Sequence, residues 1–223
     1  MLIHEKGPFV RGSILLISFL VLFCVLLTPI MRDEKGNHLT GLQYADNVFN
    51  ELSKGSSYFI PSVREHVKTV EKVNVKVTVT MKKAELAETA VQVLTKAGMT
   101  ASADGAKVSY EGNLAAMLNA ATTDADSLYH NDAATVSARY DGTHALKAAA
   151  AWWYVLSPSI KELQKQRLIA EAQVVDQVLR RAVEPGNNFY SVEPVKVSDH
   201  IWLMSGMLIF YVIYTLGKIE DAL

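Results

Sequence analysis

Two long apolar segments lie near the two ends of the chain, and the charged residues are concentrated between them. Residues 12–31 contain no ionisable side chain except the thiol of Cys24, and residues 201–217 contain only the hydroxyls of two tyrosines. An α-helix rises about 1.5 Å per residue, so roughly 20 residues cross a hydrocarbon core of about 30 Å. The pattern therefore predicts transmembrane helices at 12–31 and 201–217, one on each side of a domain at 32–200.

Alternation of apolar and polar residues marks strands inside that domain. Valine occupies every second position from Val73 to Val79, which places four side chains on one face of a half-buried strand. The dipeptide Asp104-Gly105 favours a type I′ hairpin turn between two short strands. The alternation predicts four strands, at 73–80, 99–103, 106–110 and 134–140.

Helical spacing of apolar residues predicts helices between these strands. Gly98 is placed to end a helix over 82–97, and Asn113 is placed to cap one that begins at Leu114. Thr123 and Asp126 have the spacing of a second capping box. Another helix is expected at 40–52, ahead of the first strand.

The predicted order over 73–140 is strand, helix, strand, strand, helix, strand. This is the βαββαβ order of ferredoxin-like domains, in which a four-stranded antiparallel sheet carries two helices on one face. The expected fold class is therefore a membrane-anchored α+β protein with a ferredoxin-like core and additional long helices.

Residues 142–184 supply those additional helices. An alanine-rich helix is expected first, and Ser157-Pro158 is expected to interrupt it. A second helix is expected over 159–183, with its end at the sequence Glu184-Pro185-Gly186-Asn187-Asn188.

The charge balance and the cysteine content of the chain argue against several classes of protein. The chain has 22 Lys and Arg against 23 Asp and Glu, so its net charge is −1. Nucleic-acid binding needs a concentrated basic face, which this balance does not favour. The single cysteine lies in the first apolar segment, so the domain has no disulfide framework and no thiolate metal site.

The first apolar segment has the features of an uncleaved signal anchor. Lys6 and Arg11 precede it, and its end has no small-x-small cleavage site. Lysines and arginines near the two membrane faces are tied in number, but the charged stretch before the first segment favours a cytoplasmic N-terminus. The expectation is a two-pass protein of the bacterial inner membrane, with cytoplasmic tails at 1–11 and 218–223 and the main domain in the periplasm.

No residue pattern identifies a reaction. No two histidines lie three or four residues apart, and Walker A, G-x-G-x-x-G, H-E-x-x-H and G-x-S-x-G motifs are absent from the sequence. His130, Asp132, Asp141 and His144 would have to meet in space to form a hydrolytic or metal site. They are better explained as surface loops in which Asp141 or Thr143 caps the next helix. No catalytic, cofactor-binding or metal-binding residue is therefore predicted.

Trp152, Trp153 and Tyr154 form the most suggestive group in the domain. Adjacent helical residues point about 100° apart, so both indoles cannot enter one narrow core stripe. One indole is expected in the core, and the other faces either a partner, the membrane surface or a second covered side of the helix.

These features predict a non-enzymatic membrane protein that acts as a scaffold. Its partners are the lipid bilayer and other membrane or envelope proteins, a second copy of itself among them, and no cofactor is expected. The alternative is an accessory subunit of a respiratory or transport complex, and an envelope hydrolase ranks third.

Overall fold

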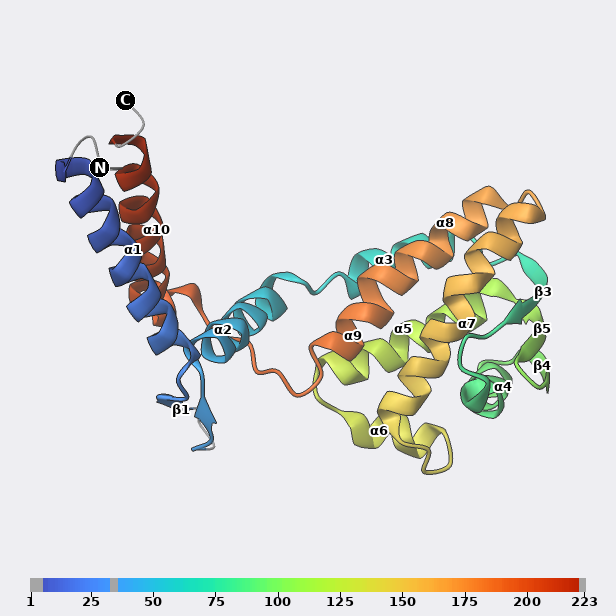
Figure 1. Cartoon of the computed structure of the whole chain (residues 1–223). Coiled ribbons are helices and arrows are strands. Elements are labelled where there is room, and N and C mark those ends of the chain that lie inside the picture. Colours follow the sequence, from blue (N-terminus) through green and yellow to red (C-terminus); the bar gives the residue numbers. More distant parts are fainter. Residues whose placement is uncertain (1–5, 33–35, 221–223) are drawn as a thin grey trace. The chain divides into compact units, whose positions relative to one another are not determined.

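The chain forms two units in the computed structural model, which describes residues 6–32 and 36–220 (Figure 1). The first unit joins Met1–Gly55 to Pro194–Leu223, and the second consists of Ser56–Glu193. The tails predicted at 1–11 and 218–223 lie partly outside the described residues. Helices and small sheets occur together, so the predicted α+β class is confirmed.

The two predicted apolar helices are present in the first unit. They are α1 (Lys6–Leu27) and α10 (Ile201–Glu220), and a 3₁₀ turn, η3 (Val197–His200), precedes α10. By length and composition, both are apolar enough to cross a membrane. Helix α1 ends at Leu27 rather than at Met31, because Pro29 disfavours helical geometry at Thr28.

Helices α1 and α10 lie side by side and contact each other through polar and aromatic side chains (Figure 1). The hydroxyls of Ser18 and Tyr214 lie 3.0 Å apart. The Phe19 ring lies 6.5 Å from Phe210 and 5.8 Å from Tyr214. Trp202 is 88% exposed at the start of α10.

The first unit also contains a short ribbon and one amphipathic helix. Strands β1 (Met31–Arg32) and β2 (His38–Leu39) pair antiparallel. Helix α2 (Gly41–Ser56) covers the helix predicted at 40–52. A reciprocal capping box begins it: the amide of Thr40 donates to Gln43 Oε1, and the amide of Gln43 donates to Thr40 Oγ1.

A three-stranded antiparallel sheet forms one end of the second unit. Its strands are β3 (Asn74–Thr80), β4 (Thr100–Asp104) and β5 (Lys107–Asn113), in the order β3-β5-β4. Val75, Val77 and Val79 are buried on one face of β3, which confirms the strand predicted from valine alternation. Helix α7 contacts this strand, and helix α4 contacts β4 and β5.

The hairpin between β4 and β5 is present, but its turn is shifted by one residue from the prediction. Asp104 pairs with Lys107, so the two loop residues are Gly105 and Ala106. Only Gly105 has positive φ, at 57°. This matches a type II′ turn, which needs a positive φ only at its first central residue, rather than the expected type I′ turn.

Helices make up the rest of the second unit. They are α3 (Ile60–Lys68), η1 (Ala84–Leu86), α4 (Ala87–Lys96), α5 (Leu114–Tyr129), α6 (Ala133–Arg139), α7 (Ala145–Lys165), α8 (Ile169–Val178), η2 (Leu179–Val183) and α9 (Glu184–Asn188). Asn113 caps α5 as predicted, because its side chain accepts from the amide of Ala116. The capping box expected at Thr123 is wrong, since Thr123 lies inside α5 and donates to Asn119 O.

The strand predicted at 134–140 is wrong, because this segment forms helix α6. Val136 and Tyr140, the two buried residues, lie four positions apart and share a face in a helix as well as in a strand. Asp132 decides between the two by accepting from the amide of Thr135 and capping the helix.

The ferredoxin-like core is consequently only partly formed. The described residues of the second unit contain three of the four expected strands, with β3 and β4 on either side of β5. This is the arrangement of a split βαβ unit followed by a hairpin partner. Helix α6 takes the place of the fourth strand in the chain order, so the sequence runs βαββαα.

Helix α7 continues through Pro158, contrary to the predicted interruption at Ser157-Pro158. Buried residues on both sides of the proline hold the helix together: Val155, Leu156, Ser159 and Leu163. The break falls instead after Lys165, where Arg167 has a φ of 64°. Packing against the core therefore outweighs the loss of one backbone hydrogen bond at Pro158.

A buried carboxylate connects three helices in the core. Asp124 on α5 is 1% exposed and accepts hydrogen bonds from Tyr140 Oη and from Trp152 Nε1. Its other oxygen forms an ion pair with Arg139 of α6. A buried charge is tolerated only when it is paired and hydrogen-bonded, and the two hydrogen bonds together with the ion pair compensate the charge of Asp124.

A second buried polar contact joins the sheet to α7. The Tyr110 hydroxyl of β5 donates to Ser159 Oγ at 2.7 Å, and Ser159 donates to Val155 O. Burial raises the pKa of Tyr110 to about 12.

Substituting Tyr110→Phe is expected to reduce the loss of stability in alkali. The folded chain holds the phenol proton more tightly than the unfolded chain, whose tyrosine pKa is about 10. Stability therefore falls as the pH rises from about 10 to 12, and at pH 11 the difference is about 1.4 kcal/mol. Urea unfolding of the full chain in detergent, at pH 8 and pH 11, measures it. Equal alkaline losses in both proteins would contradict the assignment.

Candidate functional site

A pocket of about 310 Å³ opens on the surface of the second unit beside helix α7. Three elements line it: α7, the last residue of η2, and α9. The lining residues are Ala149, Ala150, Trp153, Tyr154, Val183, Glu184, Asn187 and Asn188. The two alanines supply small side chains next to the aromatic rings, which leaves room for a ligand group.

The two adjacent tryptophans have different surroundings. Trp152 is 1% exposed and donates to Asp124, so it belongs to the core. Trp153 is half-buried, lines the pocket and donates from Nε1 to Glu184 Oε1 at 3.1 Å. One indole therefore lies in the core, as expected, and the other packs half-buried against the core at the pocket.

Tyr154 completes the aromatic side of the pocket. Its ring lies 5.0 Å from the Trp153 ring at an interplanar angle of 81°. The ammonium of Lys83 lies 5.5 Å from the centre of the Tyr154 ring, within the range of a cation–π contact.

A π-helical turn positions the polar side of the pocket. Residues Leu179–Val183 form this turn, and α9 continues from it without a break, contrary to the helix end predicted at 184–188. Pro185 directly follows the π turn, and its missing amide removes one backbone donor from this continuous helix. Such π turns re-aim the residues that follow them and are frequent at functional sites. Here the turn aims Glu184 at Trp153.

Close packing fixes the position of α9 against α5. Gly186 lies so near the α5 backbone that a Cβ at this position would be 2.6 Å from Ala125 O. Only glycine permits this approach. The contact therefore holds the polar wall of the pocket at a set distance from the core.

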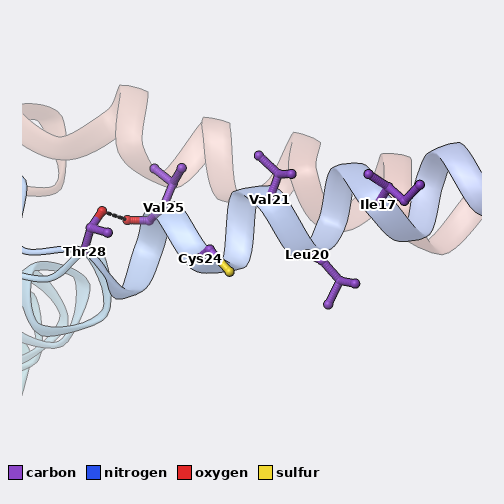
Figure 2. A pocket seen from close by; sticks show the side chains of 6 residues that line it. All are labelled: Ile17, Leu20, Val21, Cys24, Val25 and Thr28. Carbon is purple, nitrogen blue, oxygen red and sulfur yellow. Dashed lines mark hydrogen bonds between the residues drawn. The ribbon is translucent and has the colours of Figure 1, made fainter.

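A second hollow lies on the apolar helix α1, and residues of this helix alone line it (Figure 2). Its residues are Ile17, Leu20, Val21, Cys24, Val25 and Thr28. They recur every three or four positions and so follow one face of the helix. The Thr28 hydroxyl donates to Val25 O at 2.6 Å, so the remaining surface is apolar apart from the Cys24 thiol.

Three of the four residues considered for a hydrolytic site have separate local partners, and the four do not form one group. His130 Nδ1 lies 3.2 Å from Asp126, and Asp132 caps α6. Asp141 pairs with Lys96 at 3.0 Å, and His144 stands at the N-cap position of α7 without a side-chain cap. In the described parts of the chain, no three His, Cys, Asp or Glu side chains form a group that could hold a metal.

Their electrostatics follow from those partners. Hydrogen bonds from Thr135 lower the pKa of Asp132, and the Lys96 ammonium lowers the pKa of Asp141. The expected capping of α7 by Asp141 or Thr143 is wrong, since Thr143 donates instead to Gln92 Oε1.

The turn at the end of α5 holds both ends of the second unit. Tyr58, near its first residue, lies 5.2 Å from the Tyr129 ring. Asn131 donates to Glu193 Oε1 at 2.6 Å and accepts from the amide of Ser191 at 2.8 Å. The chain therefore enters and leaves this unit at one place.

No known protein family, curated protein or solved structure matches the chain. The candidate site is accordingly defined by the side chains described above.

The sequence singled out the aromatic residues of this pocket but predicted no pocket. Glu184, Asn187 and Asn188 were assigned to a helix stop because Pro185 and Gly186 normally end helices. A glycine between polar residues is also the signal of a close backbone approach, and this second meaning applies at Gly186.

Proposed function

We propose that this chain is a non-enzymatic membrane protein whose second unit binds other proteins of the bacterial envelope. The pocket at Trp153 carries the proposal. Tryptophan and tyrosine dominate binding energetics at protein interfaces, because they combine a large apolar surface with a polar edge. Both occur here beside a carboxylate and two amides, in an opening that admits a partner's side chain.

Tethering is the proposed mechanism. Helices α1 and α10 anchor the chain on both sides of the second unit, which restricts the unit to a layer near the membrane. Confinement raises the effective concentration of the binding pocket toward partners in the same membrane. Attachment of both chain ends at Tyr129–Asn131 restrains the orientation of the unit more than a single tether does.

The proposed location is the bacterial inner membrane, with both chain ends in the cytoplasm and the second unit in the periplasm. Two apolar helices of spanning length support two passes. The positively charged stretch before the first span favours a cytoplasmic N-terminus. A second copy of the chain is among the proposed partners.

A photoreactive side chain at the pocket tests the binding function. Replacing Trp153 with benzoylphenylalanine in cells that make the chain is expected to give a discrete crosslinked product on illumination. The matched control carries the same group at Lys161, an exposed position on the same helix. Mass spectrometry of the product distinguishes a different protein from a second copy. Crosslinking that is equally weak at both positions would oppose the proposal.

The second candidate function is an accessory subunit of a membrane respiratory or transport complex. The apolar hollow on α1 favours it, since a groove along a spanning helix fits the side chains of a neighbouring helix (Figure 2). The same photoreactive group at Cys24, and no product from position 153, would favour this candidate over the first.

A further inference from the structure

We propose that the pocket at Trp153 receives the guanidinium group of an arginine side chain from a protein partner. This inference rests on the proposed binding function and names the chemistry that the pocket recognises. A volume of about 310 Å³ is at the low end of ligand sites, which suits one long side chain better than a cofactor.

Charge is the first argument. Glu184 is the only charged residue that lines the pocket, and its carboxylate accepts one hydrogen bond, from Trp153. The nearby cations have other partners: Arg180 Nε binds Asp176 at 2.8 Å, and Lys83 lies over Tyr154. Glu184 acts on the charge of Arg180 one helical turn earlier, but the Arg180 guanidinium is bound to Asp176. Among the described residues no cation lies within 4 Å of the Glu184 carboxylate, which therefore has the capacity to accept an ion pair from a ligand.

The aromatic rings are the second argument. A cation is attracted to the face of a tryptophan or tyrosine ring, and tryptophan is the stronger of the two. The Lys83 contact is an example of a cation on the Tyr154 ring within the chain itself. Trp153 offers the ring next to the Glu184 carboxylate, where stacking and ion pairing act on the same group.

Geometry favours guanidinium over ammonium. A guanidinium group is planar, stacks on aromatic rings and donates along a fork that matches a carboxylate. It carries five N–H donors, and the pocket supplies acceptors on Glu184, Asn187 and Asn188. An ammonium has three donors and no plane, so it satisfies fewer of these groups at once.

The test uses the full chain in neutral detergent and short peptides as probes. Acetyl-Gly-Arg-Gly-amide is titrated while the indole N–H resonance of Trp153 is followed by NMR, and Trp153→Phe assigns that resonance. A saturable shift is expected. The citrulline peptide has the same shape without the charge, and we expect it to bind at least about tenfold more weakly than the arginine peptide. The same loss of affinity is expected for the lysine peptide.

Two single-residue variants test whether the arginine peptide binds at Glu184. Glu184→Gln is expected to weaken arginine binding about tenfold, whereas Glu88→Gln, at an exposed acidic residue on α4, leaves it unchanged. Equal binding of the arginine and citrulline peptides to the unaltered protein overturns the inference, whatever the variants do. Absence of any shift with crosslinking retained at position 153 overturns the arginine assignment alone. Loss of both overturns the proposed function as well.

Discussion

Replacing Asp124 with alanine is expected to lower the free energy of unfolding of the second unit by about 3–5 kcal/mol. The substitution removes the carboxylate that accepts from Tyr140 and Trp152 and that pairs with Arg139. The donors then lie in the core without an acceptor, and each unsatisfied group adds its own desolvation cost. A domain has only about 5–15 kcal/mol of net stability, so the expected loss is a large fraction of the free energy of unfolding.

Near-ultraviolet circular dichroism during urea unfolding of the full chain in detergent measures this loss, since Trp152 contributes to the signal. Asp176→Ala is the matched control: its pair with Arg180 is exposed, and a change within about 0.5 kcal/mol is expected. Equal effects of the two alanines would show that the Asp124 network does not stabilise the fold.

Replacing Gly186 with alanine is expected to destabilise the second unit by about 1–3 kcal/mol and to weaken ligand binding at the pocket. The added methyl would lie 2.6 Å from Ala125 O and 2.8 Å from Ala125 Cα. Both are backbone atoms of α5 and do not rotate away, so α9 has to move. Glu184 and Asn187 move with it, and the polar wall of the pocket is displaced.

The same unfolding measurement and the arginine-peptide titration record both effects. Gly55→Ala is the control, because an added Cβ there has nothing within 4 Å. It is expected to be neutral or slightly stabilising, since alanine favours a helix by up to about 1 kcal/mol over glycine. A Gly186→Ala protein with unchanged stability would mean that α9 is not held tightly against α5.

Local signals in the sequence were sufficient where one residue type settles the geometry. The valines of β3 fixed the strand and its buried face, because only a period of two places them together. Asn113 marked the start of α5 through its side-chain cap. Gly98, with a φ of 84°, marked the end of α4.

Local signals failed where two structures share the same spacing or where packing decides. Val136 and Tyr140 fit a strand and a helix equally, and the cap at Asp132 made the difference. At Pro158, buried residues on both sides of the proline keep α7 continuous. The local rule that proline interrupts a helix takes no account of such packing. The fourth strand of the predicted ferredoxin-like sheet was expected at 134–140, so the wrong assignment of this segment also made the predicted sheet one strand too large.

The pocket could be predicted only from its aromatic side. Adjacent tryptophans on a helix required that one indole leave the core, and Trp153 does. Glu184 reaches that indole because η2 is a π turn, and a different turn would rotate Glu184 to another face. Just after this turn, Gly186 packs against α5, and this contact joins residues far apart in the chain.

Attachment of both chain ends at the turn Tyr129–Asn131 determines how the second unit carries mechanical load. On the proposed two-pass topology, tension between the ends of the chain would act on Tyr58 from one side and on Glu193 from the other. Both contacts lie at the end of α5, so this load would fall first on the turn Tyr129–Asn131 and not on the Asp124 core. On that proposal, the Trp153 pocket lies away from the place where load enters the second unit.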